Sequence, residues 1–112
     1  MPLLFTYGTL RDPAVQRATF GRELTGHPDR LPGYAISPLE ITDPAVLAVS
    51  RRTHHPVAAA SGDPGDAVDG TAFEVTDAEL AAADRYEVDD YRRVLLPLAS
   101  GARAWVYVAA GT

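Results

Sequence analysis

The segment 103–108 near the end of the chain is apolar on both of the faces that an extended backbone would present. Alternate residues of a strand point to opposite sides, which puts Ala104, Val106 and Val108 on one face and Trp105 and Tyr107 on the other. A strand with two apolar faces needs protein on both sides of it. The segment is therefore expected to be a central strand of a sheet or a stave of a barrel.

Several other segments combine β-forming residues with flanking turn residues, and they are interpreted as short strands. These segments are residues 3–7, a short strand within 21–33, and residues 34–41, 45–50, 68–75 and 92–98. Ser100 and Gly101 follow the last of them and favour a tight hairpin that leads into 103–108.

Two segments carry the residues that begin a helix. Asp12 is placed as an N-cap before Pro13, a residue that is favoured at the first position of a helix. Thr76 and Glu79 have the spacing of a capping box, which is the clearest local signal in the chain. The helices are expected over residues 13–20 and 77–86.

Residues 54–66 are the least regular part of the sequence and are predicted to form a loop, which is either a lid or a connection without a function of its own. The remaining pattern contains only two strand–helix–strand crossovers, so a regular parallel α/β sheet is disfavoured. The predicted class is α+β: a small mixed, barrel-like sheet of about six or seven strands with two short flanking helices. We expect residues 1–112 to form a single domain.

The composition excludes several kinds of chemistry. The chain has 112 residues and a formal net charge of −5, it has no Cys, and its 10 basic residues are all Arg. Lysine Schiff bases, cysteine nucleophiles, disulfides and thiolate metal sites are therefore excluded. The acidic balance argues against binding to nucleic acids or to anionic membranes. With no long apolar stretch and no basic leader before Phe5, we expect a cytoplasmic protein, monomeric or homodimeric.

The first candidate site is the run Tyr7-Gly8-Thr9-Leu10, between the first strand and the first helix. A glycine allows a ligand to approach the backbone closely. Free N–H groups in such a turn suit a carboxylate or an oxyanion. The alternative is that Gly8 simply ends the strand, and the tetrapeptide alone favours that alternative.

The second candidate is Glu87, at the end of the second predicted helix. The neighbouring carboxylates Asp84, Asp89 and Asp90 would raise its pKa and suit it to general acid–base work, whereas the arginines at 92 and 93 would act in the opposite direction. The alternative is a solvated helix end with ion pairs that contribute little.

Other chemistry-bearing residues show no pattern of a site. His27, His54 and His55 lack the spacing of metal ligands, and exposed loop histidines are the favoured interpretation, so no metal is expected. Ser61 lies in a turn, without the glycine-flanked elbow of a serine hydrolase.

Four segments in order resemble the γ-glutamylcyclotransferase-like family, especially its short branch of γ-glutamylamine cyclotransferases and AIG2-like proteins. They are Phe5-Thr6-Tyr7-Gly8-Thr9-Leu10, then Val68-Asp69-Gly70 with Phe73-Glu74-Val75, then Asp84-x-Tyr86-Glu87 with Tyr91 and Arg92, and lastly Trp105-Val106-Tyr107-Val108. Each motif is weak alone. Together, spanning residues 5–108 at the right distances, they give a specific signal.

The resemblance implies a reaction in which the α-amine of a substrate attacks its own γ-glutamyl carbonyl, giving 5-oxoproline and a free amine. It implies no cofactor and a small-molecule γ-glutamyl substrate. Glu87 would be the general acid–base, the segment Tyr7, Gly8, Thr9 and Leu10 would hold the substrate carboxylate or the oxyanion through its backbone, and Tyr91 would supply a hydroxyl or an aromatic wall.

Two departures from the family pattern bear on substrate choice and activity. Val88 stands where the family often has a glycine after the catalytic Glu, and His55-Pro56 stands where many relatives have an aromatic residue before Pro. A non-catalytic ligand-binding domain on the same fold therefore remains the alternative. A third possibility is removal of a γ-glutamyl protecting group in a biosynthetic pathway.

Overall fold

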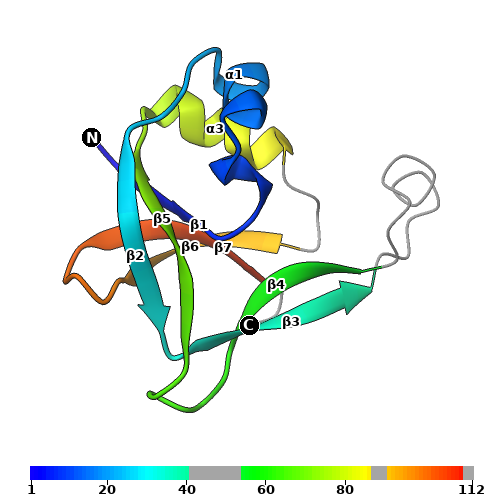
Figure 1. The fold of residues 1–112 in the computed structure, drawn as a ribbon, viewed down its shortest axis with the longest axis vertical. Helices are drawn as coiled ribbons and strands as arrows, with labels where there is room; N and C mark the ends of the chain where they lie inside the picture. Colours follow the sequence, from blue (N-terminus) through cyan, green and yellow to red (C-terminus); the bar gives the residue numbers. More distant parts are fainter. Residues whose placement is uncertain (41–53, 87–90, 110–112) are drawn as a thin grey trace.

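The computed structural model describes residues 1–40, 54–86 and 91–109. In chain order its elements are β1 (Leu3–Thr6), the 3-10 helix η1 (Thr9–Arg11), α1 (Pro13–Phe20), β2 (Gly26–Pro32), β3 (Tyr34–Glu40), β4 (His54–Ala60), β5 (Ala67–Glu74), α3 (Asp77–Tyr86), β6 (Tyr91–Pro97) and β7 (Arg103–Ala109). Figure 1 shows α1 and α3 side by side on one side of the sheet. None of the described helices is long and apolar enough to cross a membrane.

Strand β7 lies at the centre of the sheet, as its two apolar faces predicted. It pairs in parallel with β1 and with β4, and antiparallel with β6 along its whole length. Because β6 occupies one edge of β7, β1 and β4 share the other edge. The path through the sheet runs β2-β5-β1-β7-β4-β3, with β6 paired to β7. The seven described strands thus form a mixed sheet that is not closed, and the predicted mixed sheet with two short helices is confirmed.

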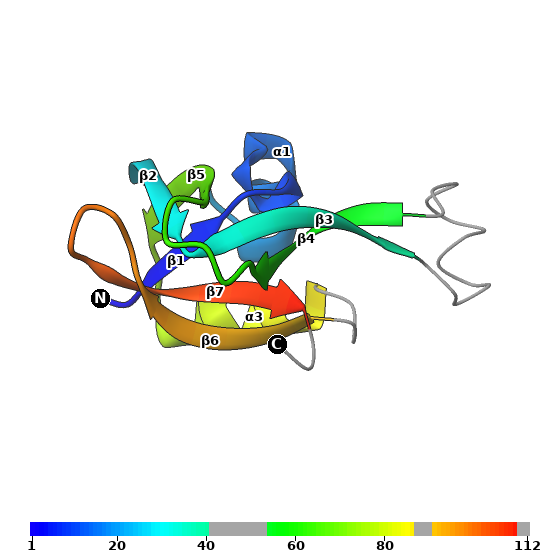
Figure 2. The same cartoon turned by 90° about the horizontal axis from the view of Figure 1, so that it is seen from below.

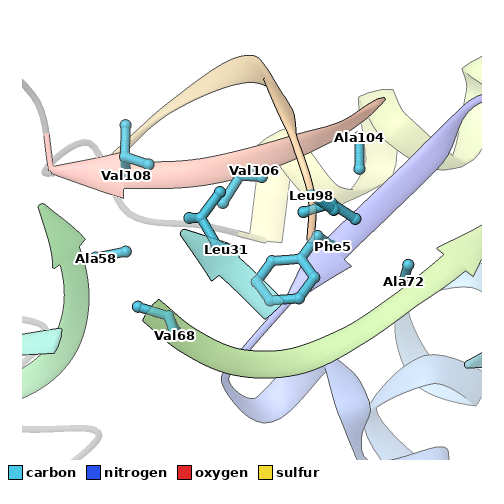
Figure 3. Close-up of a cluster of buried hydrophobic side chains, with 9 residues drawn as sticks. All are labelled: Phe5, Leu31, Ala58, Val68, Ala72, Leu98, Ala104, Val106 and Val108. Atoms are coloured by element: carbon cyan, nitrogen blue, oxygen red, sulfur yellow. The ribbon is translucent and has the colours of Figure 1, made fainter. Parts of the chain in front are cut away.

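Two clusters of buried apolar side chains lie on opposite faces of the central strands. Figure 3 shows the first cluster, which consists of Phe5, Leu31, Ala58, Val68, Ala72, Leu98, Ala104, Val106 and Val108. The second lies between the sheet and the two helices and consists of Leu4, Leu10, Phe73, Val75, Leu80, Ala83 and Tyr107. Neighbours in the chain such as Leu4 and Phe5 therefore enter different clusters, as the alternation of a strand requires.

Both predicted helices and their caps are confirmed. The backbone N–H of Ala14 donates to Asp12 Oδ1 over 2.8 Å at the start of α1. At the start of α3, the Thr76 N–H donates to Glu79 Oε1 over 2.8 Å and the Glu79 N–H donates to Thr76 Oγ1 over 3.1 Å. Arg22 also donates to both carboxylate oxygens of Glu79, over 2.7 and 2.8 Å. This ion pair ties the segment after α1 to α3, a contact that local sequence patterns do not predict.

The prediction of one continuous loop over 54–66 is wrong, because its first half is strand β4. β4 pairs antiparallel with β3 over all seven of its residues, and the two strands together extend away from the body of the sheet (Figure 2). Pro56 and the three alanines at 58–60 have a weak local preference for strands. Pairing with β3 and β7 forms the strand despite this weak preference. Only 61–66 connects β4 to β5. A lid formed by the whole segment is therefore excluded, and the strand predicted over 45–50 lies outside the described residues.

The predicted hairpin between β6 and β7 is confirmed, and Asp29 of β2 anchors its turn. Gly101 adopts a φ of 93°, in the left-handed region that favours glycine. The buried Asp29 carboxylate accepts hydrogen bonds from Ser100 Oγ over 2.6 Å, from the Ser100 N–H over 3.2 Å and from the Arg30 N–H over 2.8 Å. Burial raises the pKa of Asp29, but these hydrogen bonds and nearby His27 outweigh it, so the net pKa lies below its usual value.

Replacing Asp29 with Asn is expected to lower the free energy of unfolding at pH 7 by about 1–3 kcal/mol, because charge-assisted hydrogen bonds to the turn are lost. A lowered carboxyl pKa stabilises the fold above the unfolded-state value of about 3.9 and ceases to do so as the pH falls through the folded-state pKa. The difference in the free energy of unfolding between wild type and variant should therefore become smaller at acidic pH. Denaturant unfolding at pH 7 and pH 3 measures it, with the exposed Asp69→Asn as control. An equal gap at both pH values would contradict the assignment.

Candidate functional site

The segment 7–10 leaves β1 and forms the start of η1. Gly8 lies at this junction with a φ of −124°, a value that other residues also adopt. A Cβ placed on Gly8 would meet no atom within 4 Å. The glycine is therefore required neither by its own φ nor by the packing of the described residues, and its open side gives a ligand access to the main chain.

The backbone of this segment has occupied carbonyl groups and two donors without a partner among the described residues. The Arg11 guanidinium donates to the Tyr7 carbonyl over 3.0 Å and to the Gly8 carbonyl over 3.3 Å. Within the part of the chain that the structure describes, the backbone N–H groups of Thr9 and Leu10 have no acceptor. Two such donors suit a carboxylate or the oxyanion of an acyl-transfer intermediate.

The Tyr7 side chain fixes the start of the segment to two strands. Its hydroxyl donates to the Tyr107 carbonyl of β7 over 2.6 Å and accepts from the Ala58 N–H of β4 over 2.9 Å. These bonds place the Tyr7 hydroxyl where β4 and β7 run side by side, with Ala58 opposite Val108. The structure thus gives Tyr7 a role in holding the segment in place, which the sequence motif alone does not reveal.

Thr9 connects the segment to the C-terminal end of α3. Its Oγ1 lies 2.5 Å from the hydroxyl of Tyr86, the last residue of that helix, and the two share a hydrogen bond. Glu87, the predicted general acid–base, follows Tyr86 directly in the sequence and lies outside the described residues. The contact joins two of the motifs found in the sequence, because Thr9 belongs to the first and Tyr86 to the one that contains Glu87.

The other two predicted site residues meet at the second apolar cluster. The Leu10 side chain is buried there, so only the Leu10 backbone is available to a ligand. Tyr91, the first residue of β6, is half-buried and packs against the same cluster. Tyr91 therefore lies on the side of the sheet that carries the segment 7–10 and α3.

An ion pair lies at the end of α3, as the alternative interpretation of this helix end expected, but its partners were not predicted. Arg93 of β6 donates to both oxygens of the Asp84 carboxylate, Nε to Oδ1 over 2.8 Å and Nη2 to Oδ2 over 3.0 Å. The Tyr107 hydroxyl donates to the same Oδ1 over 2.7 Å, and the guanidinium lies 4.6 Å from the centre of the Trp105 ring. Asp84 belongs to the motif that contains Glu87, but nothing in that motif points to Arg93 or Tyr107 as its partners.

The charge of Asp84 is accordingly neutralised by its partners. Burial raises the pKa of Asp84, but the hydrogen bonds from Arg93 and Tyr107 outweigh it and hold the net pKa below the usual value. An ionised, paired Asp84 raises the pKa of a neighbouring carboxylate less than an unpaired one would. Arg93, one of the two arginines weighed against the acidic residues in the sequence, thus pairs with Asp84.

The remaining chemistry-bearing residues are not gathered into a site in the described structure. His27 lies in β2 rather than in a loop, with a side chain that is 55% exposed and 3.6 Å from an Asp29 carboxylate oxygen. His54 and His55 belong to β4. The Ser61 hydroxyl is engaged in the turn that follows β4, where it donates to the Gly33 carbonyl and accepts from the Asp63 N–H.

Comparison with known proteins identifies relatives of this fold. A family model described as gamma-glutamyl cyclotransferase, AIG2-like, matches residues 4–112. No curated protein sequence matches the chain. The range matched by the family model, 4–112, includes the segment 7–10 together with Glu87 and Tyr91.

Solved structures show the same fold. A solution structure of an Arabidopsis thaliana protein superposes with a TM-score of 0.71 at 27% identity, covering 96% of this chain and 61% of that one. A second Arabidopsis thaliana protein gives a TM-score of 0.74 at 22% identity, covering 98% and 69%. A structure named gamma-glutamyl cyclotransferase gives 0.69 at 16% identity, covering 97% and 66%. The chain spans less than two thirds of the length of the first of these proteins.

Proposed function

The chain belongs to the gamma-glutamyl cyclotransferase, AIG2-like family, and from that premise we propose that it converts a small γ-glutamyl amine or peptide into 5-oxoproline and releases the amine. The observation that carries the proposal is the hydrogen bond between Thr9 and Tyr86. It joins the segment 7–10, whose backbone offers two donors that have no acceptor among the described residues, to the residue that directly precedes Glu87 in the sequence.

In the proposed reaction, Glu87 manages the proton of the attacking amine. The α-ammonium of the substrate gives a proton to the Glu87 carboxylate, and the free amine attacks the γ-glutamyl carbonyl carbon. A five-membered ring closes and the carbonyl oxygen becomes an oxyanion. The bond to the leaving nitrogen then breaks as Glu87 returns its proton to that nitrogen. The ring nitrogen gives up its second proton through Glu87 to the released amine, which leaves as an ammonium. General acid–base catalysis of this kind contributes about 10²–10⁴-fold in rate.

The segment 7–10 would hold the oxyanion or the substrate carboxylate. Donors fixed before the reaction begins stabilise developing charge without a reorganisation cost. The hydrogen bonds of Arg11 and of the Tyr7 hydroxyl fix this backbone from two sides. Ring closure is intramolecular, so orientation of the two reacting ends is the main remaining requirement. Tyr91 would supply a hydroxyl or an aromatic wall from β6.

A panel of γ-glutamyl compounds tests the proposal. It comprises a γ-glutamyl dipeptide, glutathione and the γ-glutamyl-ε-lysine isopeptide, with 5-oxoproline and released amine quantified together. We expect release from at least one compound, and the preferred compound identifies the leaving group. A folded protein that binds γ-glutamyl compounds but releases nothing from them would instead support a non-catalytic binding domain. That alternative is suggested by Val88, which stands where the family often has a glycine.

A further inference from the structure

The carboxylate of Asp84 accepts three hydrogen bonds. Two come from Arg93 and a third from the Tyr107 hydroxyl, all between 2.7 and 3.0 Å. The Arg93 guanidinium is itself placed against the Trp105 ring. The carboxylate is thus fixed in position by β6 and β7 together, at the last turn of α3.

Tyr107 continues this chain of contacts to the segment 7–10. Its hydroxyl donates to Asp84, and its backbone carbonyl accepts the proton of the Tyr7 hydroxyl over 2.6 Å. One residue of the central strand therefore holds the end of α3 with its side chain and the start of the segment 7–10 with its main chain. The hydrogen bond between Thr9 and Tyr86 closes the connection on the other side.

We propose that Asp84 is a positioning residue, which sets the C-terminal end of α3 relative to the segment 7–10. The proposal rests on the proposed cyclotransferase function. Asp84 acts through Arg93 and Tyr107 and is assigned no contact with substrate.

The magnitudes favour positioning over stability as the role of Asp84. The side chains of Asp84 and Arg93 are 43% and 23% exposed, and partly exposed ion pairs typically contribute about 1 kcal/mol or less to folding stability. A displacement of about 1 Å between reacting groups, in contrast, can lower a rate by about 10²-fold. Loss of the carboxylate charge should therefore affect turnover far more than unfolding.

Asp84→Asn tests this role, because it keeps the shape of the side chain and removes the charge. We expect kcat to fall by about 10-fold to 100-fold with little change in KM, and the midpoint of thermal unfolding to stay close to that of the wild type. Tyr107→Phe, which removes only the hydroxyl, should lower kcat in the same direction. The double variant should lose less than the product of the two single losses, because both act through one contact.

The matched control is Asp69→Asn. Asp69 forms an exposed ion pair with Arg30 across β2 and β5, also at 2.8 Å. It undergoes the same chemical change away from α3 and should leave kcat unchanged.

A readout that needs no turnover separates this proposal from the proposed function. The backbone amide NMR signals of Gly8 and Thr9 should shift in Asp84→Asn and stay in place in Asp69→Asn. If the wild type releases no 5-oxoproline, the proposed function fails, and the amide shifts still decide whether Asp84 controls the segment 7–10. Unshifted signals, or an unchanged kcat in an active enzyme, would overturn the positioning role.

Discussion

Glu87→Gln is expected to lower kcat for 5-oxoproline release by about 10²–10⁴-fold, the usual contribution of a general acid–base. Glutamine has the size and shape of glutamate but does not take up the proton of the attacking ammonium. KM should change little, since the assigned role lies in proton transfer rather than in binding. Steady-state kinetics on the preferred compound of the panel measure the effect.

A matched control for this substitution is Glu74→Gln. Glu74 ends β5, its side chain is exposed, and it undergoes the same loss of charge. This variant should keep wild-type turnover. If Glu87→Gln also retained full turnover, Glu87 would not be the acid–base and the assigned chemistry would need another residue.

Gly8→Ala is expected to lower kcat/KM by about 10²-fold or more while leaving the fold intact. The added methyl group meets no atom of residues 1–40, 54–86 or 91–109 within 4 Å, so stability should hardly change. In the complex it would occupy the open side of the segment 7–10 and displace the oxyanion from the Thr9 and Leu10 donors. Loss of one such donor typically costs about 10²–10³-fold in rate. Kinetics and thermal unfolding of the same preparation measure both effects.

Gly70→Ala provides the opposite pattern. A Cβ there would come within 2.6 Å of the Phe5 ring and of the Thr6 carbonyl oxygen. Such overpacking of a core destabilises by about 1–3 kcal/mol. The two alanine variants should therefore differ in what they lose. Gly8→Ala should lose activity and keep its stability, and Gly70→Ala should lose stability. Full activity in Gly8→Ala would show that the open side of the segment is not where substrate binds.

Elements whose signals are local could be predicted from the sequence. The caps at Asp12 and Thr76 act within a few residues, and the double apolar face of 103–108 identifies a central strand without knowledge of its partners. Strand β4 could not be found in this way. Its Pro56 and alanines carry little preference of their own, and its pairing depends on β3 and β7, which lie elsewhere in the chain.

The candidate site divides in the same manner. The run 7–10 and Glu87 were found because they occur as short motifs with a family resemblance. The contacts that join them could not be found, since Thr9 and Tyr86 are 77 positions apart and Tyr7 and Tyr107 are 100 apart. Nor does the sequence show that Arg93 pairs with Asp84, because that contact depends on where the fold places β6 relative to α3.

The most direct test of the proposed reaction is a product analysis in water enriched with oxygen-18, using the preferred γ-glutamyl compound. Intramolecular attack by the α-amine takes no oxygen from water. The account predicts unlabelled 5-oxoproline in an amount equal to the released amine, and loss of both with Glu87→Gln. Glutamate carrying oxygen-18 in its γ-carboxylate would show hydrolysis by water, and would contradict the proposed cyclotransferase function.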